Sequence, residues 1–236
     1  MAKKMSPAGE QQVAMLCSEL GFTLQGEALK NITGYLNMLQ KWSVVMNLVG
    51  PRSWEPMLRT LIVDSLHLKR FLETLDFSVV ADSADIPMQI WDFGAGAGLP
   101  GIPLRMVWQE GEYHMVDVRE KRTMFMQMVL AKYPLPATNV HRARVEDFME
   151  GRAPAAMMVS RAFMPWPELL ELLTGKIRRG GFVVVLANEP APAHDVPDAS
   201  HGRLLPEDWS LTAQYEYSVE GSPRYFWALS SKKAPN

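Results

Sequence analysis

The sequence predicts an α/β protein in which a helical N-terminal part precedes a mostly parallel β-sheet that ends in an antiparallel hairpin. Two observations carry this prediction. Apolar residues recur at helical spacing before residue 73, and apolar strand-like segments alternate with helical segments from Gln89 onward. Such alternation is typical of a parallel sheet wound by right-handed crossovers. We therefore expect a helical extension over residues 1–75 and an α/β domain over residues 76–236.

Three helices are expected in the first part. A short helix covers Gln11–Leu20 and ends at Gly21. A longer one follows an apolar stripe with three- and four-residue spacing over Leu29–Met46. Ser53 is a candidate N-cap for the third helix, whose inward-facing residues fall within Met57–Leu72. By itself this pattern supports only a helical cap that packs on the sheet.

Strands and helices then alternate up to a Pro- and Ala-rich stretch, Asn188–Asp208, which we interpret as a long loop. After it, two β-rich segments flank a turn and predict an antiparallel hairpin. The expected parallel strands are Gln89–Phe93, Tyr113–Val118, Asn139–Ala143, Ala156–Ser160 and Phe182–Ala187. The expected helices between them include Lys121–Lys132 and Trp166–Ile177, and the hairpin strands are Leu211–Val219 and Arg224–Leu229.

The first expected strand ends in an acidic residue and a glycine-rich turn. Asp92 closes the apolar run, and Gly94, Gly96 and Gly98 follow at alternate positions. Glycines let a backbone approach a ligand closely and adopt dihedrals that a Cβ forbids. Through the turn, Asp92 is suited to accept hydrogen bonds from a cationic or amino-bearing ligand. This favours S-adenosylmethionine, which is positive where NAD carries a pyrophosphate.

Other interpretations of the same turn stay open. Gly96, Gly98 and Gly101 also satisfy G-x-G-x-x-G, which is typical of NAD and FAD sites. Pro100 and Pro103 move the expected helix start to about Gly101, because proline is tolerated only in a first helical turn. A tight strand-to-helix turn with no ligand is the structural alternative.

A second acidic residue ends the next strand. Asp117 lies 25 positions after Asp92, close to the ~20-residue offset at which a carboxylate holds an adenosine ribose. The alternative role is a carboxylate that caps the following helix, and one residue can do both. The two acidic strand ends together predict a nucleoside cofactor, and they leave S-adenosylmethionine and NAD both open.

Composition excludes several other classes of protein. The chain has 236 residues, is 47% hydrophobic, and carries one cysteine, Cys17, so it has no internal disulfide. Its five histidines lack metal-like spacing, and no apolar run is long enough to span a membrane. We therefore predict a cytoplasmic monomer with no metal and no membrane partner. The net charge of −2 means that any RNA contact must come from local basic clusters.

Over roughly Tyr35–Leu186 the chain resembles the 16S ribosomal RNA guanine-N7 methyltransferases, also called the glucose-inhibited division protein B family. The glycine segment with its Leu-Pro-Gly tail is highly specific to that family, and the other landmarks support it jointly. These landmarks are Lys41-Trp42, Asn47-Leu48, Asp64-Ser65, the segment Asp92–Leu104, Asp117 with Lys121-Arg122 and Phe125, Arg144-Val145-Glu146-Asp147, and Ser160-Arg161-Ala162-Phe163.

The resemblance implies a Rossmann-like, class I S-adenosylmethionine-dependent methyltransferase domain at residues 76–236. It also implies the reaction, transfer of a methyl group from S-adenosylmethionine to N7 of a guanine in the decoding-region loop of 16S rRNA. The partner is then 16S rRNA or the small ribosomal subunit. Guanine N7 has an in-plane lone pair, so attack needs no general base, and the main task of the enzyme is alignment.

Residue roles carry over where the motifs match. Gly94 and Leu99 are expected to line the cofactor, Val145 and Glu146 to lie beside its adenine, and Arg161 to lie between cofactor and substrate. We take Arg161 as the catalytic candidate, because its fork can pair with a phosphate or with guanine O6. The predicted cofactor-binding residues are Asp92, Gly94, Gly96, Gly98, Leu99, Asp117, Val145, Glu146 and Arg161. The alternative for Arg161 is a salt bridge at a strand end, and for Glu146 a helix cap.

Lys121, Arg122 and Arg144 are the candidate RNA-binding residues, because such clusters can follow phosphates. The alternative for the first two is a solvated helix face. The chain also departs from the family pattern. Thr60-Leu61 stands where the family has a basic residue and histidine, and Leu186 where it has the lysine of the fifth strand.

Two rival functions come from other classes. An NAD-dependent oxidoreductase shares the first turn, yet needs a proton-relay group such as a Tyr/Lys pair after the fourth strand. Met164–Pro167 offers none. A noncatalytic protein that binds RNA or a nucleoside needs no intact cofactor turn, and here the turn is intact.

Overall fold

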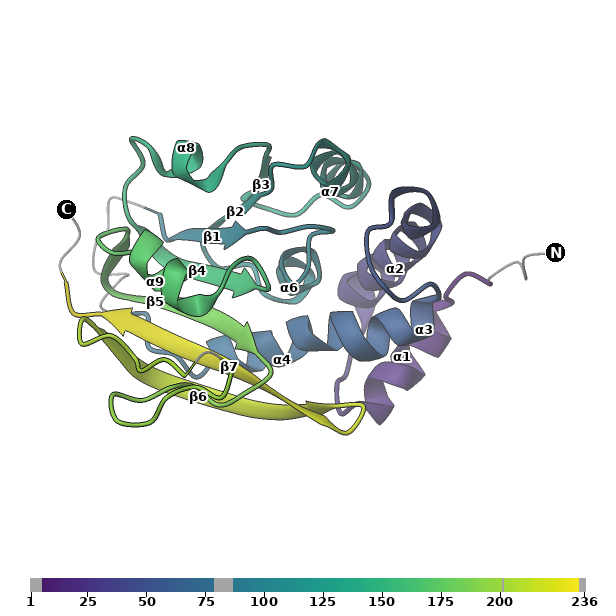
Figure 1. Cartoon of the computed structure of the whole chain (residues 1–236). Helices are drawn as coiled ribbons and strands as arrows, with labels where there is room; N and C mark the ends of the chain where they lie inside the picture. Colours follow the sequence, from purple (N-terminus) through teal and green to yellow (C-terminus); the bar gives the residue numbers. More distant parts are fainter. Residues whose placement is uncertain (1–5, 79–86, 201, 234–236) are drawn as a thin grey trace.

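A computed structural model describes residues 6–78, 87–200 and 202–233 and contains a single seven-stranded sheet (Figure 1). Its strand order is β3-β2-β1-β4-β5-β7-β6, with the first five strands parallel and β7 and β6 antiparallel to their neighbours. The predicted α/β fold with a terminal hairpin is thus confirmed. The strands are β1 Gln89–Phe93, β2 Glu112–Val116, β3 Thr138–His141, β4 Ala155–Arg161, β5 Ile177–Ala187, β6 Trp209–Val219 and β7 Ser222–Ser231.

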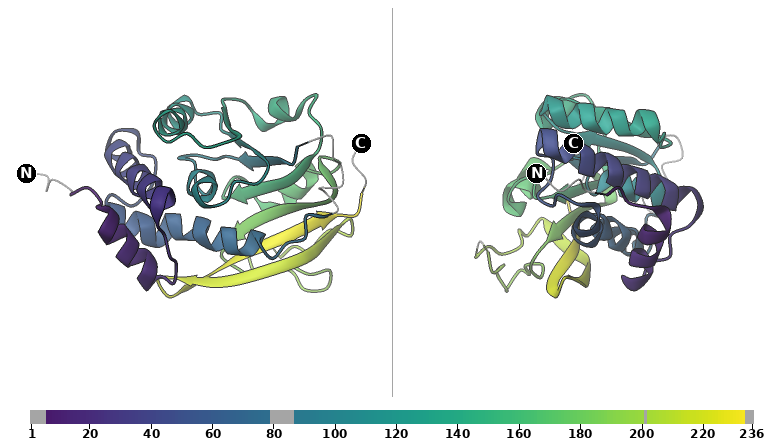
Figure 2. Two further views of the ribbon diagram at one scale, coloured as in Figure 1. Left: turned by 180° about the vertical axis from the view of Figure 1, so that it is seen from behind. Right: turned by 90° about the vertical axis from the view of Figure 1, so that its right-hand side faces the viewer.

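The helices of the N-terminal part gather at one end of the molecule, and the last of them runs along the sheet above the hairpin (Figures 1 and 2). All three predicted helices are present, the third as a continuous run of α-, π- and α-helical turns. They are α1 Glu10–Glu19, α2 Gly26–Met46, α3 Trp54–Met57, the π-helical turn η1 Leu58–Ile62 and α4 Val63–Leu72. The later helices are α6 Gly101–Val107, α7 Glu120–Lys132, α8 Val145–Met149 and α9 Trp166–Leu172.

Both faces of the central parallel strands β1, β2 and β4 are buried, as expected for parallel strands covered by crossover helices. Successive residues of β4 show this, because Met157 and Val159 pack into one apolar cluster and Met158 into the other. The first cluster is shared with α6 and α7, and the second with α8 and α9. The two-residue alternation of a strand therefore divides the core into two layers.

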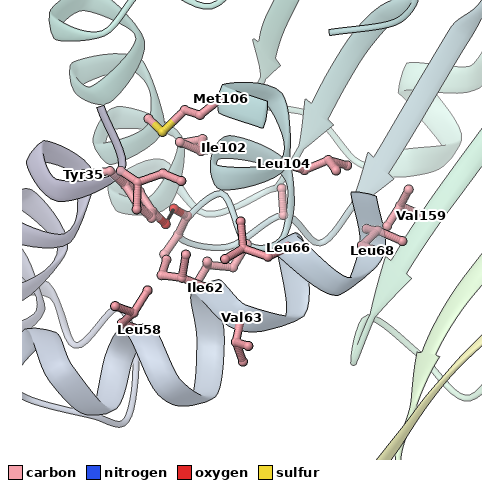
Figure 3. Packing of buried hydrophobic residues seen from close by; sticks show 14 of the residues in the cluster. Tyr35, Leu58, Ile62, Val63, Leu66, Leu68, Ile102, Leu104, Met106 and Val159 are labelled. Atoms are coloured by element: carbon pink, nitrogen blue, oxygen red, sulfur yellow. Dashed lines mark hydrogen bonds between the residues drawn. The ribbon is translucent and has the colours of Figure 1, made fainter. Parts of the chain in front are cut away.

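The N-terminal helices share the first of these layers with the sheet. Leu66 and Leu68 of α4 belong to the same buried cluster as Ile102 of α6 and Val159 of β4, and Figure 3 shows them converging from these elements. This packing places α4 directly beside the turn that leads into α6. The boundary at residue 75 remains a prediction, and residues 79–86 next to it lie outside the described residues.

The predicted helix Trp166–Ile177 is wrong at its C-terminal end. Helix α9 ends at Leu172, and Gly175 adopts a left-handed conformation with φ +72°. Ile177 then begins β5 and pairs with Ala155. The strand was expected only from Phe182, after a helix that was expected to reach Ile177. The two arginines and two glycines at positions 178–181 have weak strand propensity, and burial of Ile177 outweighs it.

Candidate functional site

The three alternating glycines form the turn between β1 and α6. Gly94, Gly96 and Gly98 have φ values of +68°, +61° and +80°, a region that favours glycine. The amide of Gly94 donates to the Val116 carbonyl at 2.9 Å, which ties the turn to the end of β2. Helix α6 begins at Gly101, where the two prolines placed it.

Asp117 holds this turn from the end of β2. Its Oδ2 accepts the Gly96 amide at 3.0 Å, and its Oδ1 accepts the Arg119 amide at 2.8 Å. The side chain is buried, and Arg122 Nη1 lies 3.7 Å from Oδ2. Asp117 therefore holds both the glycine turn and the Arg119 amide just before α7. The N-cap of α7 is Arg119, without a side-chain cap, and the ligand role of Asp117 stays a prediction.

A cavity of about 570 Å³ opens beside the glycine turn, at the carboxyl ends of the parallel strands. This is the edge at which open α/β sheets bind ligands. Six predicted residues line it: Gly94, Asp117, Arg122, Arg144, Val145 and Glu146. The other lining residues are Val116, Val118, Arg119, Ala143, Ala162 and Phe163.

Phe163 forms a wall of the cavity that the sequence did not single out as a lining residue. It follows β4, and Ala162 before it has a left-handed φ of +50°. The Phe163 ring lies close to Gly94, since a Cβ built on that glycine would come within 2.7 Å of Phe163 Cδ2. The sequence signal that could have identified it is its position two residues after Arg161, just beyond the end of a strand.

Asp92 lies behind the turn and does not line the cavity. Its Oδ2 accepts the Tyr113 hydroxyl at 3.1 Å, and the Gly101 amide also donates to the carboxyl. Burial raises the pKa of Asp92 to about 7. This geometry supports the turn, whereas the predicted contact of Asp92 with a ligand gains no support. Gly96, Gly98 and Leu99 are likewise buried and are not among the residues that line the cavity.

Two side chains of the N-terminal helices hold the same turn. The Tyr35 hydroxyl of α2 donates to the Ala97 carbonyl at 2.8 Å, and the Ser65 hydroxyl of α4 donates to the Pro100 carbonyl at 2.9 Å. Both contacts are buried. The helical part therefore braces the glycine turn, a role that helical periodicity alone did not reveal.

The basic candidates divide into two groups. Arg122 and Arg144 line the cavity, together with the neighbouring Arg119. Arg144 Nε lies 3.6 Å from Glu146 Oε2 in an exposed pair, so this pair adds little to stability. Lys121 is exposed in the first turn of α7 and does not line the cavity.

Arg161 ends β4 and forms the salt bridge that was its alternative role. Its Nη2 lies 3.0 Å from Oδ2 of Asp64, a residue of α4. The Arg161 side chain remains 23% exposed. It is not itself a lining residue of the cavity, although Ala162 and Phe163 after it are. Its register partner on β5 is Leu186, the position at which the sequence departs from the family.

The described histidines have structural partners. His114 contacts His141 and Gln89 at 3.0 and 2.7 Å, and His67 contacts the Tyr215 hydroxyl at 3.1 Å. Burial lowers the pKa of His67 and of His114 to about 4. Within the described ranges no three His, Cys, Asp or Glu residues are grouped as metal ligands, and no helix there is long and apolar enough to cross a membrane. The fifth histidine, residue 201, lies outside them.

The chain is similar in sequence to proteins of one family. The GidB family model, described as rRNA small subunit methyltransferase G, matches residues 28–193. A ribosomal RNA small subunit methyltransferase G of Oleidesulfovibrio alaskensis is 72% identical over 239 residues, with 100% of both chains covered. One of Nitratidesulfovibrio vulgaris is 46% identical over 226 residues, with 96% of each chain covered.

Solved structures with a similar fold are methyltransferases. The O-methyltransferase TomG of Streptomyces achromogenes, solved in complex with SAM, aligns with a TM-score of 0.54 at 15% identity, covering 96% of this chain and 100% of that one. A putative O-methyltransferase of Klebsiella pneumoniae aligns with a TM-score of 0.57 at 9% identity, covering 95% and 99%. At such identities the likeness establishes the class I methyltransferase fold alone.

Proposed function

The chain belongs to the rRNA small subunit methyltransferase G family, and on that premise we propose that it transfers a methyl group from S-adenosylmethionine to N7 of a guanine in 16S rRNA. The position of the glycine turn beside a cavity supports this proposal. The glycine turn, the Asp117 carboxylate and the adjacent cavity of about 570 Å³ lie together at the carboxyl edge of the parallel sheet. This is the arrangement that a nucleoside cofactor requires.

The lining residues fit S-adenosylmethionine. The cavity volume lies in the usual range of ~300–1,000 Å³ for small-molecule sites. Gly94 and Asp117 both line the cavity, and we assign Gly94 to the amino acid part of the cofactor and the Asp117 carboxylate to its ribose hydroxyls. Val145 and Glu146 would border the adenine. When bound, S-adenosylmethionine supplies the methyl group together with its leaving group.

The residues present also fit a reaction that needs no general base. The N7 lone pair of guanine is available without loss of a proton, so the rate depends on placing N7 in line with the methyl carbon. Such positioning can contribute ~7–11 kcal/mol to the lowering of the barrier. We assign Arg161 to this task, because it ends β4 and the two residues after it line the cavity.

Local charge supports an RNA substrate despite the net charge of −2. Arg119, Arg122 and Arg144 line the cavity, and Lys121 extends the basic surface on α7. Guanidinium groups pair with phosphates through two parallel hydrogen bonds. We propose that these side chains follow the RNA backbone of 16S rRNA or of the small subunit, that the protein acts as a monomer, and that it does so in the cytoplasm.

Calorimetric titration of the purified protein tests the cofactor assignment. We expect S-adenosylmethionine and S-adenosylhomocysteine to bind and NAD not to bind. Binding of NAD alone would instead support the oxidoreductase alternative. Two matched variants test whether the cofactor binds in this cavity. Glu146→Gln, in the cavity lining, should weaken binding of both sulfur ligands. Glu27→Gln, on the exposed surface of α2, should leave their binding unchanged.

A further inference from the structure

A buried carboxylate connects Arg161 to three other elements of the fold. Asp64 on α4 is only 2% exposed. Its Oδ2 lies 3.0 Å from Arg161 Nη2, and Arg224 Nη1 lies 2.6 Å from both of its oxygens. The Tyr217 hydroxyl donates to Oδ1 at 2.9 Å. Helix α4, strand β4 and both hairpin strands therefore meet at one side chain.

The charges of this cluster do not cancel. One carboxylate faces two guanidinium groups, so the ionised cluster carries a formal charge of +1. Arg161 and Arg224 are each about one quarter exposed, whereas Asp64 is enclosed. A buried carboxylate that lost these donors would carry a large desolvation penalty. Asp64 is thus held by several charged contacts, and it can in turn hold Arg161.

Within the described residues, Asp64 is the carboxylate with which Arg161 forms an ion pair. A free arginine side chain has many rotamers, and such a contact restricts them before a ligand arrives. Arg224 and Tyr217 fix the Asp64 carboxylate, and Arg224 also donates to the Thr60 carbonyl at 3.0 Å. The chain of contacts runs from the hairpin through α4 to the end of β4.

We propose that Asp64 is a positioning residue for Arg161, and that Arg224 and Tyr217 act through Asp64. The hairpin and α4 would then set where the Arg161 guanidinium meets the reacting groups. This inference rests on the proposed function, because the proposed role of Arg161 belongs to methyl transfer.

Asp64→Asn removes the charge while keeping the size of the side chain. The two guanidinium groups then repel each other without a shared anion, and Arg161 loses its fixed orientation. Misplacement of a catalytic group by about 1 Å can lower a rate ~100-fold. We therefore expect Asp64→Asn to lower kcat by about 100-fold, with less change in the KM of S-adenosylmethionine.

A double-mutant cycle tests whether Asp64 acts through Arg161. Asp64→Asn, Arg161→Met and the double variant are assayed for methyl transfer to 16S rRNA and to small subunits. We expect each single variant to lose activity, and Asp64→Asn to lower kcat by less than about threefold once Arg161 is already replaced, because coupled sites are not additive. The proposal would be overturned if Asp64→Asn lowered kcat by the same factor with Arg161 present and with Arg161→Met, or if either single variant kept full activity.

A structural control separates positioning from general loss of stability. Arg105→Met disrupts the contacts of another buried arginine, which donates to the backbone carbonyls of Glu110, Gly111 and Pro136. This variant should unfold at lower temperature and keep wild-type kcat per folded molecule. If Asp64→Asn does not fold, Arg224→Lys replaces it in the cycle, since Arg224 is partly exposed and lysine keeps the charge.

A spectroscopic readout keeps this inference separate from the proposed function. The side-chain ¹⁵N–¹H signal of Arg161, assigned by its absence in Arg161→Met, should be protected from exchange in the wild type. It should lose protection in Asp64→Asn and keep it in Arg105→Met. Retained protection in Asp64→Asn would overturn the inference even if the wild type transfers no methyl group, whereas an inactive wild type with lost protection in Asp64→Asn would contradict only the proposed function.

Discussion

Replacing Gly94 by alanine should disturb the cofactor cavity through a contact that the structure defines. Gly94 has a φ of +68°, a conformation that disfavours L residues by roughly 1–2 kcal/mol. A Cβ at this position would lie 2.7 Å from Cδ2 and 3.2 Å from Cβ of Phe163. The ring must therefore move, and overpacking of this kind typically costs a further ~1–3 kcal/mol.

Gly151 provides a matched control for the backbone contribution. It has the same φ of +68°, and a Cβ built on it would meet nothing within 4 Å. Gly151→Ala should lower Tm by about 2–8 °C, which is the conformational penalty alone at ~2–4 °C per kcal/mol. Gly94→Ala should lower Tm further, and adding Phe163→Ala should remove the part that comes from the contact.

Thermal unfolding and calorimetric titration with S-adenosylmethionine measure both effects. We expect Gly94→Ala to weaken cofactor affinity by at least about tenfold, equivalent to ~1.4 kcal/mol, because Gly94 and Phe163 both line the cavity. Gly151→Ala should bind as the wild type does. Equal losses of Tm in the two variants, together with unchanged affinity of Gly94→Ala, would refute the reasoning.

Three further predictions follow from other contacts. Burial raises the pKa of Asp92 to about 7, above ~3.9 in the unfolded chain, so the folded state keeps a proton that the unfolded state loses. The stability from this carboxyl is therefore complete below about pH 4 and is lost as pH rises through 7. The free energy of unfolding of the wild type relative to Asp92→Asn should fall between pH 5 and pH 8 in urea titrations, and a constant difference would contradict this. Arg105→Met should lower the free energy of unfolding by about 1–3 kcal/mol, because the buried Arg105 side chain loses its hydrogen bonds to three backbone carbonyls; a change below ~0.5 kcal/mol would be inconsistent with the network. Arg144→Ala should weaken RNA binding and reduce the slope of log affinity against log salt by about 0.7–0.9, the contribution of one phosphate contact; an unchanged slope would remove Arg144 from the RNA surface.

The glycine turn could be predicted from sequence because its requirements are local. Three alternating glycines after a strand call for positive φ, and Gly94, Gly96 and Gly98 all have it. The helix start at Gly101 followed from the positions of two prolines. Asp117 was found for the same reason, since its place at the end of β2 depends only on the spacing of two strands.

The contacts of the site that depend on tertiary packing could not be predicted. Arg224 and Asp64 are 160 positions apart in the chain, and nothing in either local sequence points to the other. The same is true of Tyr35, which braces Ala97 across 62 positions. The sequence indicated that Asp92 lies near the end of a strand. Its side chain points behind the turn toward Tyr113, and this direction depends on how β1 and β2 pack together.

The most direct test of the central claim is to locate the methyl group that the protein transfers. The purified chain is incubated with tritiated S-adenosylmethionine and with either 16S rRNA or small subunits that lack the modification. The RNA is then cleaved by borohydride and aniline, which break the chain at N7-methylguanine. We predict label in 16S rRNA and cleavage at one guanine. Label on another atom, or none in either substrate although the cofactor binds, would contradict the account.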